Sequence, residues 1–253
     1  MRAIRLDPAD TELYVLRGHR YAERGDLDKA IDDLNKAIQL DSCEVDALVM
    51  RATAFFDQGM IDKSFDDINL AIQMDPQNAL ALCQRGFFRL TKGEETQALS
   101  DFKQTLRIDP NFAEAHQGLG ILYTVQQQYD LAISHINDAI RLQPDNPTNY
   151  RLRGEAYALT KHYDLAIADL SEAVRRDSAD AMAIRELEAY RRVAKQIRAR
   201  PKQLPILESK HESETLHPGL KFFSIQTQKQ SDSRDYDPAC WLRRTYQSTI
   251  AGP

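Results

Sequence analysis

Apolar residues recur along most of the chain at spacings of three and four positions, the period of an α-helix that buries one face. These segments come in pairs, and prolines follow three of the pairs, at Pro76, Pro110 and Pro144. From Thr11 to Asp180 the pairs repeat at a constant interval of 34 residues without a gap. The pattern predicts an all-α chain made of tandem helix–turn–helix units.

Five segments of 34 residues can be aligned, and certain positions hold one kind of residue throughout. Position 8 is always small, which would let the second helix of a pair approach the first closely. Position 24 is always large and apolar, and position 15 carries glycine in the first three segments. The small residues are Gly18, Ala52, Gly86, Gly120 and Gly154, the large ones are Leu34, Ile68, Phe102, Ile136 and Leu170, and the glycines are Gly25, Gly59 and Gly93, replaced later by Gln127 and Lys161.

The spacing of these small, aromatic, alanine and proline positions resembles the tetratricopeptide repeat (TPR) family. The resemblance implies a right-handed α-solenoid of five repeats over residues 11–44, 45–78, 79–112, 113–146 and 147–180. Residues 181–200 keep an apolar stripe that includes Leu187, Tyr190 and Ile197, and we expect them to form a capping helix. Its basic face would suit a membrane or a calmodulin-type partner, but a solvated cap is the simpler interpretation.

The two ends of the chain depart from the repeat. Residues 1–10 match the last part of a second helix, so we expect a partial helix of an upstream repeat and a longer parent array. Residues 201–253 contain four prolines and no helical period, which predicts an extended or partly disordered tail. The tail also carries Phe222, Phe223 and Trp241, so it is expected either to fold back on the repeats or to bind a partner.

Position 7 is usually leucine in the family but is arginine in four of the five repeats here. The same four repeats carry aspartate at position 23, and the fourth repeat, with Leu119 and His135, lacks both residues. Pairing within each repeat leaves no charge unmatched, whereas pairing between neighbours does. We therefore predict four ion pairs within repeats: Arg17–Asp33, Arg51–Asp67, Arg85–Asp101 and Arg153–Asp169.

Catalytic chemistry is not visible in the sequence, which lacks the motifs of zinc proteases, nucleotide-binding loops and serine hydrolases. We therefore predict no enzyme, no catalytic residue, no cofactor and no metal. His116 occupies a position that is tyrosine or leucine in the other repeats, so it is expected to be a packed core residue. His211 and His217 in the tail make only a weak case for a metal site.

Charge and cysteine content bear on partners and location. The net charge of −5 disfavours nucleic-acid binding, which needs a broad basic face. Apolar runs are too short to span a membrane, and three scattered cysteines argue for a reducing compartment. We expect a cytoplasmic protein, in a cilium or with the cytoskeleton as one alternative, and its oligomeric state stays open.

Repeats of this family bind protein partners on the concave face of their first helices, so the resemblance implies a non-enzymatic scaffold that binds a peptide or helix. The family's contact positions are apolar in the middle of this chain, although some of these residues could instead pack under neighbouring repeats. The candidate partner-binding residues are Val49, Thr53, Phe56, Cys83, Phe87, Leu90, Gln117, Ile121, Val125 and Arg151.

Two alternatives and one exclusion complete the interpretation. Co-chaperones of the family grip the C-terminal carboxylate of heat-shock proteins with Lys and Asn, but this chain has Val15 and His19 at the first two of those positions. We therefore do not expect heat-shock protein tails as partners. The chain could be a regulatory or targeting subunit, or a fragment, of a larger enzyme or of a ciliary or trafficking complex. Its tail could also be autoinhibitory.

Overall fold

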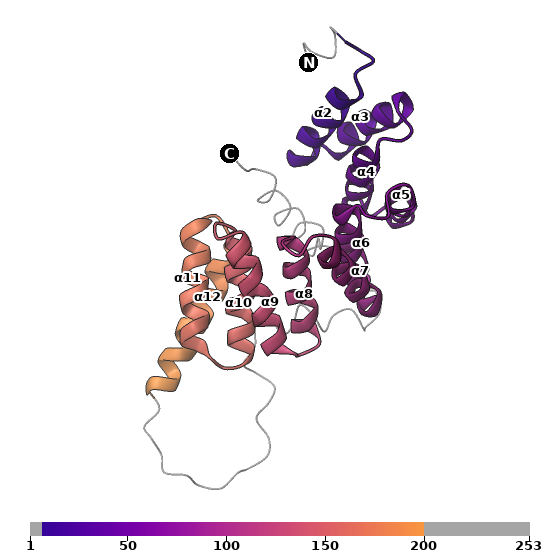
Figure 1. The fold of residues 1–253 in the computed structure, drawn as a ribbon. Helices are drawn as coiled ribbons and strands as arrows, with labels where there is room; N and C mark the ends of the chain where they lie inside the picture. Colours follow the sequence, from indigo (N-terminus) through magenta and orange to yellow (C-terminus); the bar gives the residue numbers. More distant parts are fainter. Residues whose placement is uncertain (1–6, 200–253) are drawn as a thin grey trace, which may run out of the picture. The chain divides into compact units, whose positions relative to one another are not determined.

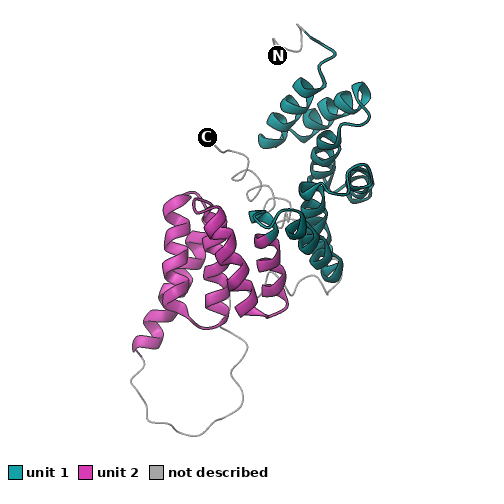
Figure 2. Ribbon diagram, viewed as in Figure 1, with its two compact units in different colours: residues 1–115, 234–253 teal, residues 116–233 magenta. Residues whose placement is uncertain are grey.

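The computed structural model describes residues 7–199, and in this range the chain forms eleven α-helices and no strand (Figure 1). The all-α helical repeat predicted from the sequence is confirmed. Most of the predicted upstream helix remnant and the whole tail lie outside the described residues. The described part divides into two units, residues 7–115 and 116–199 (Figure 2), which are treated separately below.

Unit 1 consists of three helix pairs. Each first helix packs against the second helix that follows it, and α4 also packs on α3, as α6 does on α5. The helices are α2 (Thr11–Glu23), α3 (Leu27–Leu40), α4 (Val45–Asp57), α5 (Ile61–Met74), α6 (Ala79–Thr91) and α7 (Glu95–Ile108). The unit ends three residues into α8 (Ala113–Val125).

Unit 2 contains the rest of α8, one complete first helix, two complete second helices and a longer terminal helix. In it, α10 packs against both α9 and α11, and α11 packs against α12. Its helices after α8 are α9 (Tyr129–Leu142), α10 (Pro147–Leu159), α11 (Tyr163–Arg176) and α12 (Ala181–Ala199). Over the described range, each helix is too short or too polar to cross a bilayer.

Side-chain caps fix where several first helices begin. The carboxylate of Asp10 accepts a hydrogen bond from the Leu13 amide, and the Asn78 side chain accepts one from Ala81. Asn146 caps α10 by accepting from Thr148, and Pro147 follows at the first helical position, where a missing N–H has no consequence. The sequence therefore sets the start of these helices locally, before any packing.

The small residue at position 8 is explained by the second helix of the same repeat. A Cβ added at Gly86 would lie 2.7 Å from Cε1 of Phe102, and one added at Gly120 would lie 2.5 Å from Cγ1 of Ile136. Both distances are too short for carbon atoms, so the large residue at position 24 occupies the space that a side chain would need. The close approach predicted from position 8 is confirmed in both units.

The turn between paired helices requires a left-handed residue at position 15. Gly25, Gly59 and Gly93 adopt φ of +77°, +76° and +76°, where glycine is not strained. In the last two repeats Gln127 and Lys161 adopt φ of 58° and 63° at the same position. The packing of the helices on either side imposes this conformation even on residues that do not favour it.

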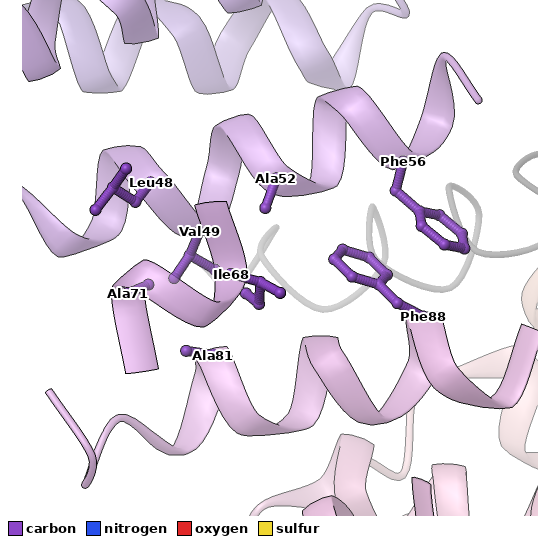
Figure 3. Close-up of a cluster of buried hydrophobic side chains, with 8 residues drawn as sticks. All are labelled: Leu48, Val49, Ala52, Phe56, Ile68, Ala71, Ala81 and Phe88. Atoms are coloured by element: carbon purple, nitrogen blue, oxygen red, sulfur yellow. The ribbon is translucent and has the colours of Figure 1, made fainter. Parts of the chain in front are cut away.

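Unit 1 has a hydrophobic core between α4, α5 and α6 (Figure 3). Phe56 of α4 and Phe88 of α6 stack with ring centroids 4.3 Å apart and planes 9° from parallel. Around them lie Leu48, Val49, Ala52, Ile68, Ala71 and Ala81, all buried. This core therefore joins two neighbouring repeats as well as the two helices of one repeat.

All four predicted arginine–aspartate pairs are present. Each guanidinium donates from Nε and Nη2 to the two carboxylate oxygens, for example at 2.7 and 2.7 Å in Arg51–Asp67 and at 2.8 and 2.7 Å in Arg153–Asp169. The other two pairs, Arg17–Asp33 and Arg85–Asp101, have the same geometry. These bidentate pairs fix the first helix of a repeat against the second.

A second contact of these arginines was not predicted. Nη1 of Arg51 donates to Asn35 of the preceding repeat at 2.7 Å, and Arg153 donates in the same way to Asn137. Arg85 does so to Asn69 at 2.9 Å. One guanidinium therefore binds three helices together. The signal was present in the sequence, because position 25 is asparagine in each repeat that precedes such an arginine.

The terminal helix α12 covers the end of unit 2. Leu187 and Tyr190 are buried in a cluster with Ala166 and Leu170 of α11. Ile197 was predicted to continue this apolar stripe, but it is 53% exposed, so the prediction is wrong at this residue. The apolar contacts of α12 end near the buried Ala194.

Candidate functional site

The candidate partner-binding residues lie on the first helices α4, α6, α8 and α10, and we call their side of each unit the first-helix face. In unit 1, Val49 and Phe56 belong to the core cluster described above. The alternative that some candidates pack under neighbouring repeats therefore holds for these two. Phe56 is covered by the ring of Phe88 on α6, and Val49 is buried in the same cluster.

Two further candidates on α6 are also buried. The ring of Phe87 meets Phe102 edge to face, with centroids 5.1 Å apart, so it packs inward against its own second helix. Cys83 is fully buried, and burial raises the pKa of its thiol well above the ordinary value. A protonated, inaccessible thiol is unreactive, so Cys83 contributes packing and no nucleophile.

Thr53 and Leu90 are the half-buried candidates of unit 1. The Thr53 hydroxyl donates to the Val49 carbonyl one turn earlier at 3.0 Å, so this hydrogen bond is made within α4. The accessible surface of the first-helix face in this unit is therefore smaller and less apolar than the sequence pattern indicates.

Unit 2 presents a polar interior on the same side of its helices. Gln117 of α8 donates from Nε2 to Oδ1 of Asn149 on α10 at 2.8 Å, and both side chains are only 1% exposed. Ile121 is buried beside them on α8, and Val125 is half-buried at its end. Two amides thus connect adjacent first helices at a place where apolar packing would be the usual solution.

Arg151 lies in the same interior with several carboxyl groups. Its Nε is 3.9 Å from Oδ2 of Asp180, and Glu155 follows one turn later on α10. Burial raises the pKa of Glu186, on α12, to about 7, and the charge of Arg151 opposes that shift. Burial also raises the pKa of Glu155, again against Arg151. One guanidinium thus lies among three carboxyl groups.

Several polar atoms of this interior make no hydrogen bond within the described residues. They include Gln117 Oε1, Asn149 Nδ2 and Glu186 Oε2, all of them buried. An unsatisfied buried polar group costs about 1–3 kcal/mol. We call Gln117, Asn149, Arg151, Glu155 and Glu186 the polar cluster of unit 2.

The sequence pointed to part of this cluster. Gln117 and Arg151 were predicted as contact residues, whereas Asn149 and Glu186 were missed. Asn149 carried a signal, because position 3 is Leu13 or alanine in the other four repeats. Glu186 lies on α12, outside the five aligned repeats, so no column could identify it.

Comparison with known proteins places the chain in a family. The family model described as "TPR repeat" matches residues 18–59, and the one described as "Tetratricopeptide repeat" matches residues 89–147 and 118–181. Together they cover more than half of the chain. A search of curated proteins found no match.

Many solved structures share the fold. A chain in the APC/C hetero-tetramer Cut9–Hcn1 matches with a TM-score of 0.70 and 20% identity, over 75% of this chain and 38% of that one. This chain therefore spans well under half the length of that relative. TTC0263, a TPR protein of Thermus thermophilus, matches with a TM-score of 0.65 and 19% identity, over 72% of this chain and 98% of that one.

A third similar structure is YrrB, described as a TPR protein with an unusual peptide-binding site. Its TM-score is 0.50 at 18% identity, over 74% of this chain and 96% of that one. At these identities the likeness establishes the fold and not a shared activity. Proteins with such repeats generally mediate protein–protein interaction and are typically non-catalytic. The family models, the solved structures and the aligned columns agree, and the chain is a member of the tetratricopeptide repeat family.

Proposed function

We propose that the chain is a non-enzymatic scaffold that binds a peptide or helical segment of a protein partner on its first-helix face. The polar cluster of unit 2 would recognise the segment, and the half-buried Val125 of the same unit would contact it. On the first-helix face of unit 1, considered by itself, the half-buried Thr53 and Leu90 would be the accessible contacts. The buried candidates, such as Phe56 and Phe87, would shape the face from beneath. A cytoplasmic or ciliary location remains a prediction.

One observation carries the proposal: the amide pair of Gln117 and Asn149 is only half used. Their mutual hydrogen bond leaves Gln117 Oε1 as an acceptor and Asn149 Nδ2 as a donor. A peptide group offers the complementary N–H donor and C=O acceptor. A partner backbone would therefore satisfy both atoms, whereas an apolar surface would leave both unpaired.

The charge of the cluster indicates what side chain the partner should carry. Burial raises the pKa values of Glu155 and Glu186, and the charge of Arg151 offsets this shift in part. A Lys or Arg placed beside them would allow both carboxylates to ionise and to form charge-assisted hydrogen bonds. We therefore expect a basic residue in the bound segment. YrrB, whose structure is described as having a peptide-binding site, gives a precedent on the same fold.

Gln117 and Arg151 are at most 5% exposed. The first-helix face of unit 2 must therefore open before a segment can reach them. An autoinhibitory tail would control such opening, and its residues 201–253 lie outside the described range. If the tail restrains the face, deleting residues 201–253 should increase the affinity for a bound peptide. An unchanged affinity would reject autoinhibition while leaving the binding proposal intact.

The binding proposal can be tested with a random linear-peptide phage library selected on the full chain. Selected peptides would then be titrated calorimetrically against the wild type, Asn149→Ala and Gln117→Ala. We expect each substitution to weaken binding by about tenfold, as for the loss of one hydrogen bond in a buried site. Asn111→Ala, at an exposed loop residue, is the matched control and should bind as the wild type does. Equal affinity of all four proteins would contradict the proposal.

A further inference from the structure

The fourth repeat replaces the arginine–aspartate link with a group of different chemistry. It has Leu119 at position 7 and His135 at position 23, so no guanidinium can join α8 to α9 there. Instead His116 of α8 and His135 of α9 face each other, with Nδ1 atoms 3.2 Å apart. Asp138 lies one turn beyond His135, and its Oδ2 is 3.9 Å from His116 Nδ1.

These three side chains bring ligand atoms together at distances that suit one metal ion. One ligand atom from each of the three side chains lies within 4.8 Å of the other two. In a tetrahedral zinc site with Zn–N bonds of about 2.0–2.1 Å, two ligand nitrogens are separated by about 3.3 Å. The imidazole separation of 3.2 Å therefore already matches. Asp138 must approach by a small rotation, which its 40% exposed side chain permits.

The surroundings hold the candidate ligands in place. The ring of Tyr123 stacks on His135 with centroids 5.5 Å apart and planes 16° from parallel. Arg141 donates to Oδ1 of Asp138 at 3.2 Å, which leaves Oδ2 facing His116. A partner on the outer oxygen of a ligand carboxylate is the usual support for such a ligand. The half-buried position of His135 gives an ion a route from the solvent.

We propose that His116 Nδ1, His135 Nδ1 and a carboxylate oxygen of Asp138 bind one divalent transition-metal ion of the zinc class. Two imidazoles and one carboxylate favour zinc over magnesium or calcium, which prefer oxygen ligands. The fourth position would hold water. In this repeat the metal would take over the role of the guanidinium in the others, namely a cation that links the first helix to the second.

The two imidazoles contact each other through Nδ1, so a metal ion bound there would replace this contact. Arg141 supports the Asp138 carboxylate without being a ligand itself, so Arg141→Ala should weaken zinc binding less than His116→Ala or His135→Ala does.

The test is a calorimetric titration of Zn²⁺ into the full chain and its variants. The wild type should bind one ion, and His116→Ala and His135→Ala should each lower the affinity at least about tenfold. His162→Ala is the matched control, because this exposed histidine contacts Thr160 and lies outside the cluster. It should bind zinc as the wild type does. Mg²⁺ should give no comparable heat.

A second variant separates loss of the site from loss of the fold. The double substitution Leu119→Arg with His135→Asp restores the ion pair found in the other four repeats, so the helices should stay linked without a metal. We expect it to unfold at a temperature at least equal to that of the metal-free wild type and to show no rise in melting temperature on addition of Zn²⁺. The wild type should show a rise.

Two results would overturn the proposal. One is a wild-type chain that shows neither zinc binding nor thermal stabilisation by zinc. The other is zinc binding of unchanged affinity in His135→Ala and in the double variant, which would assign the ion to other histidines among the six in the chain.

Discussion

At the scale of single residues, arginine at position 7 is the main electrostatic link of the fold. Each of these guanidiniums uses one edge for an aspartate of its own repeat, and from the second repeat on it also reaches an asparagine of the preceding one. Asp101 is shared further, because Arg89 also donates to it at 2.7 Å. Arg89 stands where the other repeats have Tyr or Phe, so this contact explains the only exception in that column.

Asp101→Asn should be strongly destabilising. Its carboxylate is buried and neutralises both Arg85 and Arg89, so removing the charge leaves two guanidiniums without their partner. We expect the free energy of unfolding to fall by about 3 kcal/mol, measured by urea denaturation. Asp145→Asn is the control, because that side chain is 97% exposed and should change stability by less than about 0.5 kcal/mol. A loss of stability as small in Asp101→Asn as in Asp145→Asn would contradict the role assigned to Asp101.

Gln127→Gly should stabilise the chain, although most substitutions do the opposite. Gln127 adopts φ of 58°, the conformation that glycine supplies in the first three repeats. Relief of the left-handed strain is worth about 1 kcal/mol before the extra flexibility of the unfolded chain is subtracted. Gly59→Ala, the reverse change at the same position, should lower stability. The stability of both variants is measured from the midpoint of urea unfolding. A loss of stability in Gln127→Gly would refute the argument.

At the scale of helices, the contact between positions 8 and 24 sets the distance between the two helices of a repeat. Gly86 faces the ring of Phe102, and Gly120 faces Ile136. The periodicity and these two columns were enough to predict the helix pairs and their close approach, and positions 7 and 23 were enough to predict the ion pairs. The same pattern overestimated the exposed apolar surface, because it could not show that the Phe56 ring stacks on Phe88 of the next repeat.

Gly86→Ala tests which of two opposing effects dominates. Alanine improves helix propensity by about 1 kcal/mol, but its Cβ would lie 2.7 Å from the Phe102 ring, and overpacking costs about 1–3 kcal/mol. We expect a net loss of stability in thermal unfolding. The double variant Gly86→Ala with Phe102→Leu should lose less than the two single changes added together, because the smaller side chain relieves the contact. Strict additivity would show that the two positions do not interact.

At the scale of the whole molecule, the polar cluster of unit 2 relates stability to function. Buried carboxyls with raised pKa values and unsatisfied amides lower stability, and natural proteins keep such features mainly at functional sites. Sequence columns revealed Gln117 and Arg151 but not their environment. The burial of these side chains, and with it the pKa of Glu186, depends on how α8, α10 and α12 pack. The residues at a single repeat position do not encode that packing.

The cluster predicts how stability depends on pH. Glu186 has an ordinary pKa of 4.5, and burial raises it to about 7 in the folded chain. Below pH 4.5 the Glu186 carboxyl is protonated in both the folded and the unfolded chain. Between pH 4.5 and about 7 it ionises only in the unfolded chain, so the free energy of unfolding falls as the pH rises. Glu186→Gln should flatten this slope and, above about pH 7, stabilise the chain by about 2 kcal/mol. Glu188→Gln, at an exposed residue of the same helix, should keep the slope.

The most direct test of the central claim observes the Asn149 side chain itself. A peptide selected on the full chain would be titrated in during NMR measurement of the side-chain amide groups, with Asn149→Asp used to assign its resonance. We predict that the Asn149 Nδ2 protons shift and become protected from exchange, because a partner carbonyl accepts from them, while those of the exposed Asn111 stay unchanged. A peptide that binds and leaves the Asn149 resonance unmoved would contradict recognition by this face.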